Sequence, residues 1–488
     1  MKQTWLSIIY VSLLGAKFVY STPTAACKAL QSVLPGRVFF PGSEEYVNDN
    51  EHYTQASSEN STCSVEPESV EDVGIILQTV AMGDTRSPFA IRGAGHTANT
   101  GFSSTTGVQI SMSKFDGVEY DEDRSTVKIG AGLTWDEVYA RLQPHGMTVV
   151  GGRVPGVGVG GLLLGGGYSL WTDQYGLSID TVVAHDLVLP NGTFIEVNES
   201  TSPDLFFALK GGFNNFGIVT SFTMKAFPQT DIWVGVITYP HNATKAAHQA
   251  MESYSFNNTD SKAAVITAYM ATGTGETSQA AGLFYNAPMQ PSGIFDGLLN
   301  VPGAVIEVSG VMGFADALSI LGGPLASLNP PRTIRDTVPV TRYTVGILDE
   351  IKNQVDRILS EAMSSNRSFV DIDFGPEPFV QPNAHSTDSA YPHPPGRFTC
   401  PTVLVVDWID SADDEFFTNA MREARQAIQT RAIEEGQSFP DDIVYNNYAP
   451  ADTPLDLLYG NNLGRLRDIK RRIDPDNVMG LAGGFKIE

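Results

Sequence analysis

Two glycine-rich segments hold the residue types that could bind a cofactor and react with it. The first combines one cation, two glycines, a histidine and a hydroxyl, as Arg92, Gly93, Ala94, Gly95, His96 and Thr97. Glycines let backbone N–H groups approach a pyrophosphate closely, and successive N–H groups form anion-binding nests. Imidazole is the one nucleophile of this segment that is substantially neutral at pH 7. By itself, the segment is equally compatible with a tight turn around a hydrogen-bonded histidine.

The second segment covers residues 151–161 and is followed by three more glycines at 165–167. So many glycines would cost too much conformational entropy in an ordinary helix or strand, which indicates a loop whose backbone binds something. Gly156, Gly158 and Gly161 fit the GxGxxG pattern of a Rossmann site, but the acidic residue expected about 20 positions later is missing. We therefore predict a different kind of cofactor site, with these candidate residues in the second loop: Gly152, Val157, Gly158 and Gly161.

Three further segments follow the glycine loops in order along the chain. They are DLFFALKGGFNNFGIV at residues 204–219, YNNY at 445–448 and LRDIKRRIDPDNV at 466–478. Together the five segments resemble FAD-linked oxidases of the vanillyl-alcohol oxidase superfamily, with its PCMH-type FAD-binding domain. Within that superfamily they resemble the berberine-bridge-enzyme-like branch, of the type found in fungal secondary metabolism. The resemblance covers roughly residues 63–227 and 446–488.

The resemblance implies an α+β fold. A two-lobed FAD-binding domain is expected at residues 22–228, after a signal peptide at 1–21. An α+β substrate domain with an antiparallel sheet is expected at 229–440, and a C-terminal segment at 441–488 returns to close the FAD site. In the family, the histidine that matches His96 bonds to the 8α-methyl group of FAD, which raises the oxidising power of the flavin. Val219 is a further expected cofactor-binding residue.

The sequence departs from the family pattern at several flavin-site positions. Many relatives attach FAD a second time through a cysteine where this chain has Val154, so we expect a single attachment and a less oxidising flavin. Gly156, Leu162 and the pair 213–214 also differ from the residues usual in relatives. Val157 matches a small residue that resembles an oxygen gate, which implies that molecular oxygen reoxidises the flavin. The alternative is that Val157 only packs the loop.

Removal of a hydride from carbon usually requires a base for the departing proton. Tyr448 matches a tyrosine that faces the substrate in relatives, so Tyr448 and its neighbour Asn447 are the candidate catalytic residues. A phenol with its ordinary pKa of about 10 is a poor base at neutral pH unless a cation or a hydrogen bond lowers that pKa. A packing or orienting role for Tyr448 is the alternative. Tyr445, Asp407 and Asp410 are weaker candidates.

Local sequence patterns predict the elements that position these segments. Short β-rich runs are expected at residues 127–129, 182–189 and 218–222, and a more extended sheet is expected to include residues 232–238 and 263–271. Thr134 and Glu137 form a capping box that begins a helix ending near Gln143. Further helices are expected at 203–209, where Pro203 suits the first turn, and at 463–473.

Residues 381–396 are rich in proline and contain two histidines, which predicts an irregular loop across the surface. We interpret His385 and His393 as unpaired loop histidines, and we predict no metal site.

The charge balance and the first residues bear on partners and location. Lys and Arg total 31 against 55 Asp and Glu, and the net charge of -24 would repel nucleic-acid phosphates and anionic membrane headgroups. Lys2, an apolar run over residues 5–14 and Ser21 are typical of a secretory signal cleaved after Ser21. The run is far shorter than the ~20 residues of a membrane-spanning helix. We therefore expect a secreted or secretory-lumen protein without nucleic-acid or membrane partners.

An oxidising compartment permits disulfide bonds, so the three cysteines can be interpreted. We expect Cys27 and Cys63 to pair and Cys400 to be a buried free cysteine. N-glycosylation sequons, which suit a secreted glycoprotein, begin at Asn60, Asn191, Asn198, Asn242, Asn257 and Asn366.

The sequence as a whole predicts an FAD-dependent oxidase that transfers a hydride from a small organic molecule to the flavin, with oxygen as the final acceptor. The expected substrate is a secondary metabolite, such as an alcohol, an amine-bearing carbon or a polyketide ring. A secreted carbohydrate oxidase, a ring-closing catalyst with little net redox chemistry and a flavin-binding protein without turnover remain alternatives. Reducible bound flavin with release of hydrogen peroxide would distinguish them.

Overall fold

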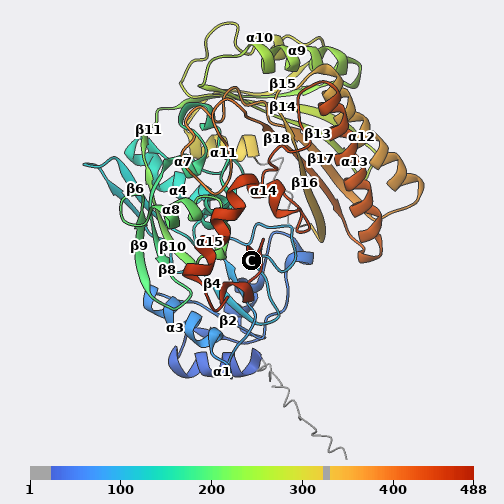
Figure 1. The fold of residues 1–488 in the computed structure, drawn as a ribbon. Coiled ribbons are helices and arrows are strands. Elements are labelled where there is room, and N and C mark those ends of the chain that lie inside the picture. Colours follow the sequence, from blue (N-terminus) through green and yellow to red (C-terminus); the bar gives the residue numbers. More distant parts are fainter. Residues whose placement is uncertain (1–22, 323–329) are drawn as a thin grey trace, which may run out of the picture.

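The structure, a computed structural model, describes residues 23–322 and 330–488. The predicted signal peptide at 1–21 lies outside these residues. Figure 1 shows the N-terminal part, coloured blue to green, beside a large sheet with helices on its outer face. The C-terminal segment, in red, returns from that sheet to lie against the N-terminal part (Figure 1). This arrangement agrees with the predicted α+β fold and the predicted return of the chain end.

The N-terminal part contains two sheets and one small ribbon. The strand order of the first sheet is β1 (Val38–Phe39), β2 (Cys63–Val65), β4 (Val108–Ser111) and β3 (Phe89–Arg92). The order of the second is β5 (Val118–Asp121), β6 (Thr126–Gly130), β10 (Ile218–Lys225), β8 (Val182–Val188) and β9 (Phe194–Asn198). The ribbon pairs β7 (Met147–Thr148) with β11 (Phe227–Pro228). Strands β6, β8 and β10 confirm the three predicted β-rich runs.

The helices around these sheets follow their local sequence signals. Helix α4 (Trp135–Leu142) begins at the predicted capping box, where the Thr134 backbone N–H donates to the Glu137 carboxylate over 2.8 Å. The predictions for α8 (Pro203–Leu209) and α15 (Leu463–Ile473) are also confirmed. The other helices of this part are α1 (Pro23–Val33), α2 (Glu44–Asn50), α3 (Val70–Ala81), α5 (Val159–Gly165), α6 (Thr172–Tyr175) and α7 (Ser178–Thr181), and α14 (Leu455–Tyr459) precedes α15 in the C-terminal segment. Helix α5 includes Gly160 and Gly161, so the prediction of a loop was wrong for the end of the second glycine-rich segment.

The large sheet has seven strands, and every neighbouring pair is antiparallel. Its order is β15 (Val305–Met312), β12 (Ile232–Tyr239), β14 (Thr277–Tyr285), β13 (Ala263–Thr272), β17 (Phe369–Pro376), β18 (Cys400–Trp408) and β16 (Arg332–Val340). Helices α9 (Thr244–Asn257), α12 (Val345–Ser364) and α13 (Asp414–Glu434) cover its outer face, and α10 (Asp296–Leu299) packs beside α9 (Figure 1). Helix α11 (Phe314–Gly322) instead contacts β12 and helix α4 of the N-terminal part. Apolar side chains of α9, α10, α12, α13 and of the outer sheet face form one buried core. The predicted extended sheet is therefore confirmed.

Three adjacent strands of this sheet set the register of one wall of the site. Val405 on β18 pairs with Arg335 on β16 and with Asp373 on β17. Directly opposed residues share a face of a sheet, so these three side chains form a row across the inner face. Glu377 follows the last residue of β17 and extends the same wall.

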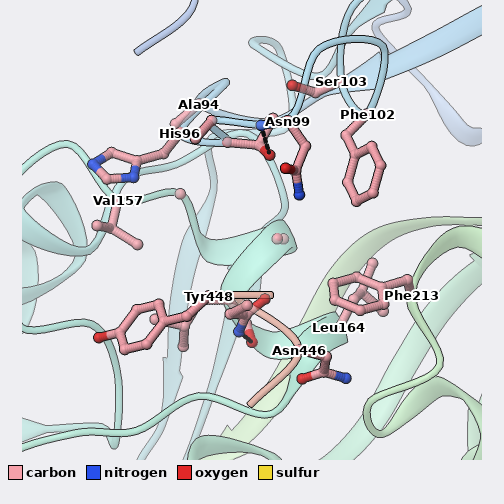
Figure 2. Close-up of a pocket in the computed structure, with 18 of the residues that line it drawn as sticks. Ala94, His96, Asn99, Phe102, Ser103, Val157, Leu164, Phe213, Asn446 and Tyr448 are labelled. Carbon is pink, nitrogen blue, oxygen red and sulfur yellow. Dashed lines mark hydrogen bonds between the residues drawn. The ribbon is translucent and has the colours of Figure 1, made fainter. Parts of the chain in front are cut away.

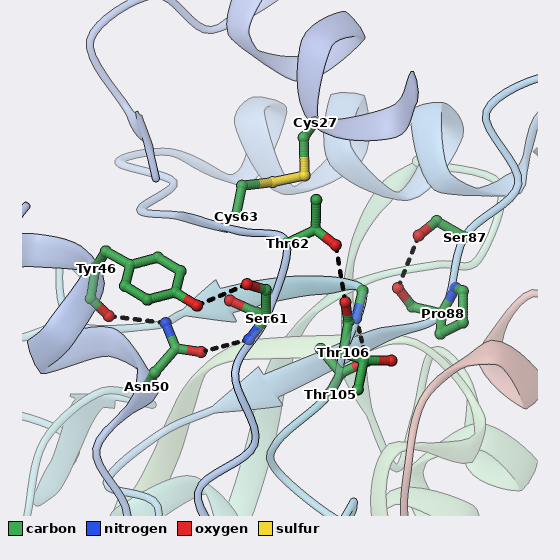
Figure 3. Close-up of a disulfide and its surroundings, with 11 residues drawn as sticks. Cys27, Tyr46, Asn50, Ser61, Thr62, Cys63, Ser87, Pro88, Thr105 and Thr106 are labelled. Atoms are coloured by element: carbon green, nitrogen blue, oxygen red, sulfur yellow. Dashed lines mark hydrogen bonds between the residues drawn. A yellow bond between two sulfur atoms is a disulfide. The ribbon is translucent and has the colours of Figure 1, made fainter. Parts of the chain in front are cut away.

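A disulfide bond joins Cys27 of α1 to Cys63 of β2, 36 positions further along the sequence (Figure 3). Beside it, Tyr46 of α2 donates its hydroxyl to the Ser61 carbonyl over 2.6 Å. The pairing confirms the prediction and fastens the first helix to the four-stranded sheet. Cys400 is free and buried, as expected.

The proline-rich loop at residues 381–396 is irregular, as predicted, but it does not simply cross the surface. Tyr391 and His393 are buried, and His393 Nε2 lies 3.0 Å from the Asp180 carboxylate. The interpretation of His393 as unpaired was therefore wrong, because Asp180 lies 213 residues away in sequence and only the fold brings it to the loop. Burial alone would raise the pKa of Asp180, but the hydrogen bond and charge of His393 hold it below its ordinary value. His385 is exposed.

Two further observations concern the described residues alone. In residues 23–322 and 330–488, no three His, Cys, Asp or Glu side chains are grouped so that they could hold a metal ion. Over the same ranges, no helix has the length and apolar character needed to cross a membrane.

Candidate active site

A cavity of about 310 Å³ lies between the two glycine loops, the C-terminal segment and the inner face of the large sheet. Figure 2 shows His96, Val157 and Tyr448 toward one end of it, and Phe102 and Phe213 toward the other. Of the candidate residues from the sequence, those that line the cavity are Gly93, Ala94, Gly95, His96, Thr97, Val157, Gly158, Gly161, Val219, Tyr445, Asn447 and Tyr448. Segments that are hundreds of residues apart thus meet around one space.

Two candidate residues, Arg92 and Gly152, are not among those that line the cavity. Arg92 turns away and donates from Nε to the Glu51 carbonyl over 2.7 Å. Gly152 packs on Trp135, and a Cβ at position 152 would come within 2.6 Å of the indole ring. Both residues therefore stabilise their loops on the side away from the cavity, and neither contacts the space where a cofactor would lie.

The glycines bring the two loops together and leave space on the cavity side. A Cβ at Gly158 would lie 2.9 Å from the Ala94 Cβ, so only glycine permits this close approach. Gly161 lines the cavity, and a Cβ there would have no atom within 4 Å. A side chain at Gly161 would project into the space that the loops enclose. The glycines thus leave room for a bound group between the two loops.

Several cavity residues also hold polar atoms that no described protein group satisfies. These atoms are Ser103 Oγ, Arg335 Nε, Asp373 Oδ1 and Asn446 Oδ1. Buried polar atoms are normally hydrogen-bonded, so unsatisfied ones around a cavity indicate a missing partner. A mostly apolar cavity with a few scattered polar groups is the usual form of a cofactor site, and its residues fit the predicted FAD.

His96 lies at the end of the cavity that contains Val157 and Tyr448. Its ring is 4.4 Å from the Tyr53 ring, centroid to centroid, and its Nδ1 is 3.3 Å from Nη1 of Arg335. Burial, and then the charge of Arg335, lower the pKa of His96 to about 3. The imidazole is therefore neutral at pH 7, as a nucleophile must be.

Arg153, Glu377 and Tyr448 form a hydrogen-bonded network in the cavity wall. Arg153 Nη2 donates to both Glu377 oxygens over 2.9 and 3.0 Å and to the Tyr448 hydroxyl over 3.1 Å. Tyr448 in turn donates to Glu377 Oε1 over 3.0 Å. Burial, and then the charge of Glu377, raise the pKa of Tyr448 well above its ordinary value. The phenol is thus protonated at neutral pH and already bound to a possible proton acceptor.

The other residues considered as catalytic candidates differ in position. Asn447 lines the cavity, but its amide donates to the Leu162 carbonyl and to the Tyr445 hydroxyl, which suits an orienting role. Asp407 lies on β18 beyond the lining residues Val403 and Val405, and it does not line the cavity. Asp410 is exposed and accepts from the Ala412 backbone N–H. Neither aspartate lies where substrate chemistry would occur.

Among the lining residues that were not named from the sequence, four have charged side chains: Arg153, Arg335, Asp373 and Glu377. Arg153 stands inside the second glycine loop, so a cation in that loop was a visible signal. The other three come from β16 and from β17 and its end, and no local motif marks them. Asp373 is notable because burial, followed by the charges of Asp371 and Asp407, raises its pKa to about 8.

Comparison with known proteins agrees with this geometry. Residues 61–198 match the family described as "FAD binding domain", and residues 444–482 match "Berberine and berberine like". The FAD-dependent monooxygenase drtC of Aspergillus calidoustus is 32% identical over 484 residues, which span 94% of this chain and 90% of that protein.

Two solved structures show the same fold. Physcomitrella patens BBE-like 1 matches with a TM-score of 0.77 and 20% identity, over 93% of this chain and 97% of that one. Glucooligosaccharide oxidase from Acremonium strictum, which carries a 6-S-cysteinyl, 8α-N1-histidyl FAD, matches with a TM-score of 0.77 and 19% identity, over 93% and 97%. Together with the cavity, these matches show that the chain belongs to the berberine-bridge-enzyme-like family of FAD-linked oxidoreductases.

Proposed function

We propose that this protein is an FAD-dependent oxidase of a small, largely apolar secondary metabolite, with FAD attached once, through His96, and with molecular oxygen as electron acceptor. The observation that carries the proposal is the Arg153–Glu377–Tyr448 network, which lies in the same cavity as a neutral His96. Tyr448 and Glu377 could accept a proton from the substrate, and His96, in the same cavity, could bind the flavin.

The chain's own residues divide the work of holding the cofactor. The backbone of the glycines at 93, 95, 158 and 161 would contact the cofactor directly, and Val219 and Asn446 would contact its edges. When bound, FAD supplies a two-electron acceptor for hydride transfer. A single link through His96 is supported by its low pKa and by Val154, which lines the cavity where many relatives have the second attaching cysteine.

Tyr448 and Glu377 would handle the substrate proton together. A protonated phenol cannot act as a free base at neutral pH, but it can accept a proton while it passes its own to a bound carboxylate. Burial raises the pKa of Glu377, and the Arg153 guanidinium opposes this shift. The Glu377 carboxylate is thus a better proton acceptor than an exposed glutamate, and it remains paired with Arg153.

Val157 supports the choice of oxygen as acceptor. Its side chain is only partly buried and lines the cavity near His96 (Figure 2). A bulkier residue at this position would narrow the approach, whereas valine leaves room for a molecule as small as oxygen.

The lining favours an apolar substrate over a sugar. Ile266, Val403 and Val405 present aliphatic side chains from the inner sheet face, and Leu164 does so from helix α5. A carbohydrate site would need many polar partners for its hydroxyl groups, because unpaired polar groups are costly to bury. The name of drtC raises monooxygenation as a second candidate, in which an oxygen atom enters the product.

Residues 22–228, 229–440 and 441–488 remain our proposed domains, and the two family matches fall within the first and third. Secretion after removal of residues 1–21, with glycosylation at some sequons, is proposed on the sequence and is consistent with the disulfide bond.

The purified protein tests the proposal directly. Flavin should remain with the acid-precipitated protein, and a screen of phenolic, alcoholic and polycyclic metabolites should find one that reduces the flavin and yields one hydrogen peroxide per turnover. Cello-oligosaccharides serve as the comparison set, and activity on them alone would favour the carbohydrate oxidase. With ¹⁸O₂, label in the organic product would contradict the oxidase and support monooxygenation. Substrate conversion without peroxide, label or oxygen uptake would favour a ring-closing catalyst.

A further inference from the structure

Arg335 brings a positive charge from the large sheet to the imidazole of His96. Its Nη1 lies 3.3 Å from His96 Nδ1, and its guanidinium carbon lies 4.4 Å from the centroid of the Tyr53 ring. The Tyr53 and His96 rings are themselves 4.4 Å apart. Arg335, Tyr53 and His96 therefore form a cluster in which each member touches the other two, although they lie up to 282 residues apart in sequence.

Ion pairing does not explain this placement. No carboxylate within salt-bridge distance of Arg335 is recorded among the described residues, and its Nε is buried without a hydrogen-bond partner. Arg332, three residues earlier on the same strand, instead pairs with Asp414 at the periphery. A partly buried cation without a counter-charge costs stability, which indicates that its position serves another purpose.

The contact has a definite consequence for the histidine. A guanidinium has five N–H donors and no acceptor, so His96 Nδ1 must present its lone pair to Arg335. The proton of the neutral ring then resides on Nε2. The same cation disfavours a second proton on the ring, and the Tyr53 face restricts how the ring can rotate.

We propose that Arg335 is the positioning residue for attachment of FAD to His96, because it presents the ring with the lone pair on Nδ1 and so selects Nδ1 as the bonding atom. The inference rests on the proposed His96 linkage. In the net reaction, one C–H bond of the flavin 8α-methyl and the Nε2–H bond of the imidazole are lost, and one C–N bond forms. The two electrons enter the flavin and pass with two protons to molecular oxygen, which becomes hydrogen peroxide.

The Arg335 contact affects His96 both before and after the bond to the flavin forms. Before attachment it fixes which nitrogen carries the lone pair, and Arg335 must swing aside as carbon takes its place. After attachment, the nearby cation favours loss of the Nε2 proton. Methionine at position 335 has no charge and no donor, so it would leave both tautomers populated and the ring held by Tyr53 alone. Glutamine can either donate to Nδ1 or accept from it, so it would not select one tautomer.

The test compares Arg335→Met and Arg335→Gln with wild type, with Arg335→Lys as the conservative variant and Arg332→Met as the matched control outside the cavity. Each purified holoprotein is acid-precipitated, and flavin is measured in the pellet and in the supernatant. Each variant is also produced under flavin limitation, so that it carries no flavin, and is then incubated in air with excess FAD to follow the rate of attachment. These readouts report covalent linkage and do not require a substrate.

We expect complete attachment in wild type and Arg332→Met, and at least a tenfold slower attachment in Arg335→Met and Arg335→Gln, with free flavin still bound in the folded protein. Arg335→Lys should recover part of the rate. Wild-type rate and extent in Arg335→Met would overturn the proposal. If Arg335→Met binds no flavin because it misfolds, Arg335→Gln gives the decision by the same criterion. A wild-type pellet without flavin would instead contradict the His96 linkage itself.

Discussion

The Tyr448 hydroxyl donates a hydrogen bond to Glu377 Oε1 over 3.0 Å, so the candidate base of the C-terminal segment is already connected to a carboxylate at the end of β17. Arg153 donates to both groups. The sequence suggested Tyr448, with its neighbour Asn447, and allowed Tyr448 to act as a base only if a cation or a hydrogen bond lowered its pKa. The structure instead raises the pKa of Tyr448, which makes Glu377 the final proton acceptor in the proposed mechanism.

Tyr448→Phe should retain flavin but lose most turnover, because the change removes only the hydroxyl that relays the proton. General acid–base assistance is typically worth roughly 100-fold or more, or about 3 kcal/mol of barrier. The rate of anaerobic flavin reduction by the identified substrate measures the chemical step. Tyr459→Phe, which removes a buried hydroxyl outside the cavity, is the control. A change of less than about threefold with chemistry rate-limiting would exclude Tyr448 from proton transfer.

Glu377→Gln should also slow flavin reduction, by roughly tenfold or more, because an amide keeps the shape of the side chain but accepts a proton poorly. The variant leaves Arg153 without its counter-charge, so some loss of thermal stability is expected as well. Reduction rates measured well below the unfolding temperature separate the two effects. Normal reduction in Glu377→Gln together with a strong defect in Tyr448→Phe would mean that the tyrosine passes its proton elsewhere.

The sequence was informative where function depends on local backbone. The first glycine loop, the capping box of α4 and the ends of α15 are set by residues within a few positions of one another, and these were predictable. The second glycine-rich segment was predicted as a loop, but its end forms helix α5. The roles of Glu377 and Arg335 were not predictable, because each depends on a partner on another element. Arg153 lies 224 residues from Glu377, and His96 lies 239 residues from Arg335. His393 was misinterpreted for the same reason, since its partner Asp180 is distant in sequence.

Val154→Cys should create a second attachment point for the flavin, because Val154 lines the cavity at the position where many relatives attach FAD through cysteine. The sharpest version combines it with His96→Ala, which removes the proposed native link. Flavin in the acid pellet of the double variant, and none in the pellet of His96→Ala, is the expected result. A double variant that binds flavin but releases all of it in acid would show that the loop does not bring position 154 within bonding distance.

The Cys27–Cys63 disulfide should contribute about 4 kcal/mol to the free energy of unfolding, from the loop-entropy relation for a separation of 36 residues. The double variant Cys27→Ser, Cys63→Ser should therefore unfold at lower urea concentration. Cys400 is buried and its thiol pKa is raised by burial, so it should react with a thiol reagent only after unfolding. Peptide mapping that finds Cys400 bridged to either partner would contradict this assignment.

Asp373 should make the protein less stable as the pH rises from about 4 to about 8. Its folded-state pKa is raised to about 8 by burial and then by Asp371 and Asp407, whereas an unfolded aspartate titrates near 3.9. Between these values the folded state holds one more proton than the unfolded state, so the free energy of unfolding falls with rising pH.

Asp373→Asn removes this titration and should stabilise the holoprotein at pH 8 by an amount on the order of a few kcal/mol, with little effect near pH 4. Urea unfolding at pH 4.5, 6 and 8 measures the trend. Asp441→Asn is the control: Asp441 is exposed, and its pKa is lowered by its hydrogen bond to Arg397, so its small contribution has the opposite pH dependence. A difference between Asp373→Asn and wild type that stays constant across this range would mean that Asp373 is ionised in the folded protein. In that case Asp373 could accept a hydrogen bond from a substrate but could not donate one.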